Sequence, residues 1–124
     1  MAIDQKVGIV VFGHGSSVAS ANEAVGIVAD SAAHAGGWGL YETAFLECAP
    51  RLGDAVGKLI ARGASSVLVL PYFLTLGIHL QRDLPVLVKE LTQQFGIAIE
   101  IAPPLDGHPG LGAMLVDRAV EALG

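Results

Sequence analysis

Four apolar segments, each followed by a segment with helical spacing, constrain most strongly how this chain can fold. Residues 7–12 form a continuous apolar run rich in β-branched side chains, which ends at Gly13 and is typical of a strand buried on both faces. Further strands are predicted at residues 40–46, 66–74 and 97–102. Four such units predict a single α/β domain over residues 1–124, with a four-stranded parallel sheet and helices on both faces.

Cap and breaker residues predict where the helices begin and end. Ser20 with Glu23 three residues later matches a capping box for the first helix, which should stop at Gly36-Gly37. Pro50 fits the first turn of the second helix, and Asp83 is a suitable N-cap for the third. The last helix carries its apolar residues on one face: Leu111, Met114, Leu115, Ala119 and Leu123.

Composition excludes several classes of function. The net charge is −5 and no run of Lys or Arg occurs, which argues against binding to nucleic acid or to an anionic membrane surface. The one cysteine, Cys48, cannot form an intrachain disulfide. No apolar run reaches membrane-spanning length, and the polar residues 1–6 do not resemble a signal peptide. A cytoplasmic protein is therefore expected.

Three groups with useful chemistry follow the first three predicted strands. They are His14, Glu47 and His79, separated by 33 and 32 residues, or one strand–helix unit each. Because parallel strands all end at the same edge of a sheet, the three side chains can gather there, where ligands of such sheets bind.

Two imidazoles and a carboxylate suit a first-row divalent ion, and histidine also suits proton transfer near neutral pH. Each residue also has a simpler interpretation: His14 as a turn residue, His79 as a structural histidine, Glu47 as a solvated or capping carboxylate. Because all three residues occur at equivalent positions after successive strands, the interpretation as one functional site is favoured. The glycines from Gly13 do not complete a dinucleotide fingerprint, and a Gly-x-Ser-x-Gly elbow is absent.

The motifs around these residues resemble those of the sirohydrochlorin chelatases, and more narrowly the short, single-domain cobaltochelatases of cobalamin biosynthesis. The resemblance covers nearly the whole chain. It rests on Gly13-His14-Gly15-Ser16, Phe45-Leu46-Glu47, Pro71-Tyr72-Phe73-Leu74 leading to Gly77-Ile78-His79, Asp83-Leu84-Pro85, and Pro104-Leu105 with Gly107-His108-Pro109.

This resemblance implies a lyase-type metal chelatase in which His14 and His79 bind the incoming metal or accept pyrrole protons, assisted by Glu47. The divalent ion, Co²⁺ first and Fe²⁺ or Ni²⁺ as alternatives, is then a substrate, and no permanently bound cofactor is expected. For the tetrapyrrole, Tyr72, Leu76 and Ile78 are candidate apolar contacts, and Ser16 and Arg82 are candidate polar ones.

One position departs from the family pattern and keeps an alternative open. Ser17 stands where the family usually has a basic residue that could pair with substrate carboxylates. This favours, as the alternative, a non-catalytic tetrapyrrole or metal carrier on the same scaffold. A flavodoxin-like nucleotide binder is a third reading.

A homodimer is also expected. One lobe presents one sheet edge, a shallow surface for a broad macrocycle, and longer family members carry two lobes around a cleft. The 52% hydrophobic content is generous for so short a chain.

Overall fold

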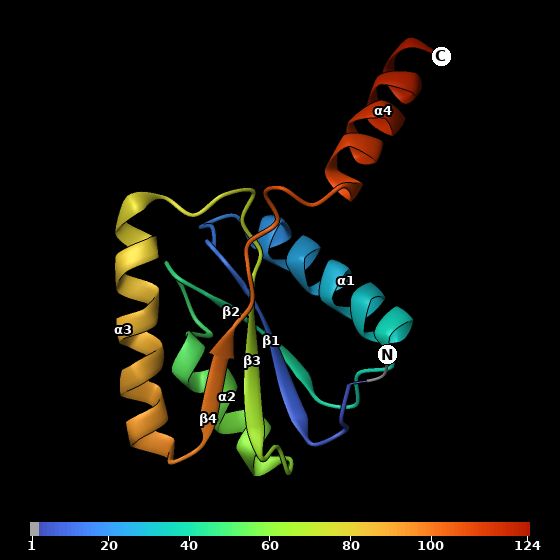
Figure 1. Cartoon of the computed structure of the whole chain (residues 1–124). Coiled ribbons are helices and arrows are strands. Elements are labelled where there is room, and N and C mark those ends of the chain that lie inside the picture. The colour runs from blue at the N-terminus through green and yellow to red at the C-terminus, as the bar shows by residue number, and fades with distance from the viewer. Residues whose placement is uncertain (1–2) are drawn as a thin grey trace.

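The computed structural model describes residues 3–124 and contains a four-stranded parallel sheet (Figure 1). The strands are β1 (Val7–Gly13), β2 (Tyr41–Phe45), β3 (Ser66–Pro71) and β4 (Ala98–Ile101), in the spatial order β2-β1-β3-β4. In the register, Phe12 lies opposite Ala44 on one side and Pro71 on the other. The predicted fold class is confirmed. The strand order reverses at β1, because β2 lies on one side of it and β3 on the other, and ligands of such sheets bind at this point.

Three helices pack on the sheet. α1 (Ala19–Gly36) covers one face over β1 and β2, whereas α2 (Leu52–Ala61) and α3 (Ile78–Phe95) cover the other. α1 is tied to β2 by the Tyr41 hydroxyl, which donates to Asp30 Oδ1 at 2.8 Å, and this bond raises the pKa of Tyr41.

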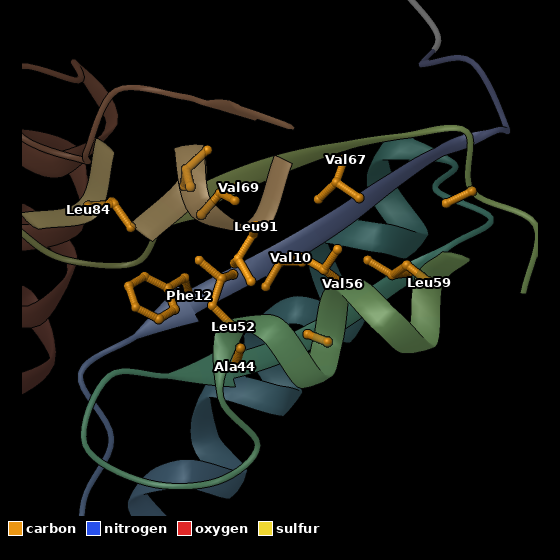
Figure 2. Close-up of a cluster of buried hydrophobic side chains, with 13 residues drawn as sticks. Val10, Phe12, Ala44, Leu52, Val56, Leu59, Val67, Val69, Leu84 and Leu91 are labelled. Carbon is orange, nitrogen blue, oxygen red and sulfur yellow. The ribbon is translucent and has the colours of Figure 1, made fainter. Parts of the chain in front are cut away.

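The main hydrophobic core lies between the sheet and the α2–α3 layer (Figure 2). Alternate strand residues such as Val10, Phe12, Val67 and Val69 point into it, as the two-residue period of a strand requires. Each is at most 2% exposed, and full burial of such a side chain contributes about 1.5–3 kcal/mol. This core fixes the sheet that holds the loops at its carboxyl edge.

The charged residue of the second strand is explained by its position. β2 is an edge strand, and Glu42 pairs with Arg62 at 3.3 Å and Lys58 at 3.9 Å on or just after α2. The strand expected at residues 40–46 is therefore confirmed, shortened to Tyr41–Phe45.

Three predicted helix starts are wrong. α1 begins at Ala19 after Val18, without a side-chain cap, so Ser20 and Glu23 form no capping box. α2 begins at Leu52, and Pro50 precedes its N-cap. α3 begins at Ile78, five residues before Asp83. Asp83 therefore lies inside the helix and cannot cap it, and its carboxylate accepts from the Arg82 guanidinium at 2.8 Å.

Strand β3 also ends earlier than expected, at Pro71 rather than Leu74. Proline has no amide hydrogen to continue the ladder. Gly37 and Gly96 adopt left-handed backbone conformations and end α1 and α3, as predicted.

The last helix, α4 (Gly110–Leu123), does not pack as a fourth layer element. It extends away from the body of the molecule (Figure 1), and none of its residues is buried. Its predicted apolar face is present but uncovered. Within residues 3–124, no helix combines the length and apolar character needed to cross a membrane.

Candidate active site

The pairing of β1 with β2 brings His14 and Glu47 together. The ladder continues past both strands, since the Leu46 amide donates to Gly13 O at 3.0 Å and the Glu47 amide donates to His14 O at 2.9 Å. Two residues far apart in sequence thus leave the sheet side by side, as predicted from topology.

Their side chains face each other at an open edge. His14 Nε2 lies 3.8 Å from Glu47 Oε1, and the two side chains are 65% and 60% exposed. His14 Nδ1 lies 3.1 Å from Gly15 O; since a carbonyl can only accept, the ring nitrogen donates there. That bond favours the tautomer with its hydrogen on Nδ1, which leaves a lone pair on Nε2.

In that tautomer, the lone pair on His14 Nε2 and a carboxylate oxygen of Glu47 face each other, so a cation between them can be bound by both. Two ligands roughly 2.1 Å from one tetrahedral ion lie about 3.4 Å apart, so the observed 3.8 Å needs only a small contraction. The pair is suited to receive a divalent ion that can also leave.

The loop that carries His14 is held tightly against the loop that carries Glu47. Gly15 has φ +88°, and a Cβ on it would lie 2.9 Å from both Cys48 Sγ and Phe45 Cβ. Only glycine fits this position without displacing a neighbour.

A side chain that sequence reasoning did not single out, Asn22 in the first turns of α1, joins the two loops. Its Oδ1 accepts from the Ser16 amide at 2.9 Å, and its Nδ2 donates to Ser16 O at 2.9 Å and to Cys48 Sγ at 3.6 Å. Asparagine is suited to this because one amide supplies both an acceptor and two donors. An amide near the start of the helix after the first strand is the only sequence signal for it.

Arg51 was also missed. Its guanidinium donates to the Leu46 carbonyl and, at 3.5 Å, to the Glu47 carbonyl. It therefore holds the backbone that presents the Glu47 side chain.

His79 lies in the first turn of α3, at the same carboxyl edge of the sheet. Its Nδ1 accepts from Arg82 Nη2 at 3.4 Å, because an arginine can only donate. Arg82 is in turn paired with Asp83, which raises the pKa of Arg82 and lowers that of Asp83. Nδ1 therefore acts as a donor in His14 and as an acceptor in His79 in these two contacts.

The predicted three-residue site is not preformed. Among residues 3–124, no three His, Cys, Asp or Glu side chains lie close enough to hold one metal ion. The structure brings His14 and Glu47 together and leaves His79 apart, paired with Arg82.

The candidate substrate contacts are spread around the same edge. Ser16 Oγ accepts from the Val18 amide at 3.0 Å, Ile78 is 79% exposed, and Tyr72 is 38% exposed. The Leu76 carbonyl accepts from the Gln81 side chain at 2.8 Å. Tyr72 lines a cavity of about 460 Å³ between the loop after β3, α1 and α4, which does not include His14 or Glu47.

Solved structures share this fold. The crystal structure of a putative cobalamin biosynthesis CbiX protein from Marinobacter aquaeolei is 29% identical and covers 94% of each chain, with a TM-score of 0.83. Because α4 begins at Gly110, a match of that extent reaches into α4. The chelatase SirB from Bacillus subtilis, solved in complex with cobalt, is 23% identical over 79% of this chain and 43% of its own, with a TM-score of 0.71.

Curated relatives agree with this. A sirohydrochlorin cobaltochelatase from Methanopyrus kandleri is 28% identical and covers 95% of this chain and 98% of its own. One from Saccharolobus islandicus is 37% identical over 66% of this chain and 70% of its own. The CbiX family model matches residues 8–122, and the chain therefore belongs to the CbiX family.

Proposed function

We propose that this protein is a sirohydrochlorin chelatase that inserts a divalent metal ion, with Co²⁺ as the expected metal. The observation that carries the proposal is the exposed His14–Glu47 pair, whose Nε2 and Oε1 atoms face each other at 3.8 Å. Membership of the CbiX family and the cobaltochelatase relatives support it. The metal is a substrate rather than a resident cofactor.

Insertion requires the ion to lose water and two pyrrole N–H protons to leave. The His14 lone pair and the Glu47 carboxylate replace part of the hydration shell and hold the ion above the ring. Because no third His, Cys, Asp or Glu side chain joins this pair within the described residues, the ion stays weakly held and can pass to the pyrrole nitrogens. Each pyrrole nitrogen gives its proton to a base and its electron pair to the metal.

Glu47, released as the ion passes to the ring, is the proposed base for one pyrrole proton, and His79 is the proposed base for the other, controlled by Arg82. In the structure Arg82 occupies the lone pair on His79 Nδ1. A substrate carboxylate that draws Arg82 away would free this lone pair to accept a pyrrole proton. Arg82 would then link substrate binding to proton removal, and both Arg82 and His79 would contact the macrocycle.

The experiment is anaerobic incubation with sirohydrochlorin and Co²⁺, Fe²⁺ or Ni²⁺ in separate reactions, followed by absorbance. The expected result is many equivalents of metallated product per protein chain, fastest with Co²⁺. Stoichiometric binding without turnover would overturn the proposal in favour of a carrier. The uncatalysed rate with each metal is the control.

We also propose that the working form is a homodimer, because the exposed His14–Glu47 edge encloses little of a broad macrocycle by itself.

A further inference from the structure

The proposed substrate carries carboxylates, whereas the protein has a net charge of −5, so single cations near the site must attract it. The loop after β1, residues 14–18, contains no Lys or Arg. After the next two strands come Arg51, just before α2, and Arg82, near the start of α3. Arg82 is already paired with Asp83 at 2.8 Å. This leaves Arg51 as the group to consider.

Among residues 3–124, the Arg51 guanidinium forms no ion pair with an Asp or Glu side chain. It donates to the Leu46 carbonyl and, at 3.5 Å, to the Glu47 carbonyl. An arginine has more N–H groups than these contacts use. Because the residue is exposed, its charge and its remaining donors are accessible to a ligand.

The position of Arg51 in the chain explains where its side chain lies. Arg51 is the N-cap of α2, where side chains that accept hydrogen bonds are usual, but a guanidinium can only donate. It therefore contacts loop carbonyls instead of helix amides, while its backbone amide donates to Asp54 Oδ2 at 2.8 Å. These contacts hold the guanidinium in place before a ligand arrives, which reduces the entropy lost on binding.

A small apolar cavity adjoins the guanidinium. Its volume is about 200 Å³, and Arg51 is the charged residue of a lining that includes Phe45 at the end of β2, Leu52 of α2 and Leu87 of α3. A cavity of this size is smaller than the pockets that enclose whole ligands, so it fits one side chain of a macrocycle rather than the ring. Apolar walls also strengthen the attraction between opposite charges.

We propose that Arg51 binds a carboxylate side chain of the tetrapyrrole, and that the adjoining cavity receives the apolar part of that side chain. The inference rests on the proposed function and adds a specificity-determining residue to it. Arg51 contacts the Glu47 carbonyl at 3.5 Å, and the Glu47 carboxylate faces His14 at 3.8 Å. Arg51 thus attaches the rim of an anionic macrocycle beside the pair that holds the metal ion.

The first test is Arg51→Gln, which removes the charge but keeps an amide that can donate to the Leu46 carbonyl. Binding of metal-free sirohydrochlorin is measured by absorbance titration, and Co²⁺ affinity and turnover are measured separately. The dissociation constant and KM should rise about five- to tenfold at low salt, with kcat and Co²⁺ affinity unchanged. Lys58→Gln, which removes one positive charge near the other end of α2, is the matched control and should bind like wild type.

This pattern separates substrate binding from a structural role. If Arg51 only supports the Glu47 loop, Arg51→Gln should lower kcat or Co²⁺ affinity and leave sirohydrochlorin binding unchanged, and that result would overturn the inference. Arg51→Lys keeps the charge without the planar guanidinium, so its affinity for sirohydrochlorin should lie between those of wild type and Arg51→Gln. An affinity as low as that of Arg51→Gln would contradict a charge interaction.

Salt provides a further check that needs no change in the loop. Added salt should weaken sirohydrochlorin binding more in wild type than in Arg51→Gln, because the variant has lost one of the charges that salt screens. Failure of this inference is distinct from failure of the proposed function. Wild type without turnover would contradict the proposed function, whereas wild-type turnover with equal KM in Arg51→Gln and Lys58→Gln would contradict the role of Arg51 alone.

Discussion

His14 Nε2 and Glu47 Oε1 lie 3.8 Å apart because their residues occupy neighbouring positions where the β1–β2 ladder ends. The pair is the part of the candidate site that the sheet brings together by itself.

Removing either member of the pair should have unequal effects on metal insertion. His14→Ala removes the lone pair on Nε2 and should abolish most turnover. Glu47→Gln keeps the shape but removes the charge, and should weaken Co²⁺ binding by about tenfold, in the range found when groups around a metal are altered. Titration with Co²⁺ and anaerobic turnover are the measurements, with circular dichroism to verify the fold. Full turnover in folded His14→Ala would rule out the mechanism.

His79→Ala should also abolish most turnover, but for a different reason. Its Nδ1 is engaged by Arg82 rather than by the His14–Glu47 pair, so the loss should appear in kcat with little change in Co²⁺ affinity. A large fall in Co²⁺ affinity without substrate would show that His79 is a metal ligand from the start.

Asn22 is expected to be a positioning residue. Asn22→Ala leaves the Ser16 amide and carbonyl without their partner and frees the loop from Cys48. We expect a stability loss of about 1–3 kcal/mol and a fall in kcat of about tenfold or more, measured by denaturant unfolding and turnover. Asn22→Asp retains the acceptor for the Ser16 amide and should retain part of kcat. An unchanged kcat in Asn22→Ala would show that the loop contacts are structural only.

Gly15→Ala should destabilise the protein, because the new Cβ meets Cys48 Sγ and Phe45 Cβ at 2.9 Å in a backbone with φ +88°. The expected cost is about 1–3 kcal/mol, with weaker Co²⁺ binding because His14 is displaced. Gly26→Ala in α1 is the matched control: beyond its chain neighbours and the backbone of its own helix, no atom lies within 4 Å of the new Cβ, and the change should stabilise the helix by about 0.5–1 kcal/mol. Denaturant unfolding of both variants decides the matter, and equal effects would contradict the packing argument.

Asp83→Asn should release Arg82 for an anionic substrate. The pair shifts the pKa of both groups toward the charged forms, by hydrogen bonding and by their attraction. Without the Asp83 charge, Arg82 is free to meet a substrate carboxylate, and KM for sirohydrochlorin should fall several-fold, most clearly at low salt. Arg82→Gln should raise KM. If both variants leave KM unchanged, Arg82 does not contact the macrocycle.

Local pattern was enough to predict much of this protein. The apolar runs and their helical partners defined four strand–helix units, and one unit of spacing placed His14 and Glu47 at the same edge of the sheet. That works because the direction and handedness of parallel crossovers leave few arrangements open. The glycines that end α1 and α3 were also predictable, because glycine adopts the left-handed backbone conformation needed there without steric cost.

Other features depended on which groups meet in space. Asp83 was expected to cap α3, but the helix begins earlier, at Ile78 after Gly77, so His79 and Asp83 lie within it and the Asp83 carboxylate pairs with Arg82. Asn22 joins two loops that only the folded sheet brings together. The placement of α4 could not be inferred either, because an amphipathic helix specifies that one face needs cover but not which surface covers it. The sequence by itself determined the strands and helices and the sheet edge at which the candidate site residues lie. The tertiary structure decided which side chains contact one another at that edge, because those contacts join residues that have no fixed spacing along the chain.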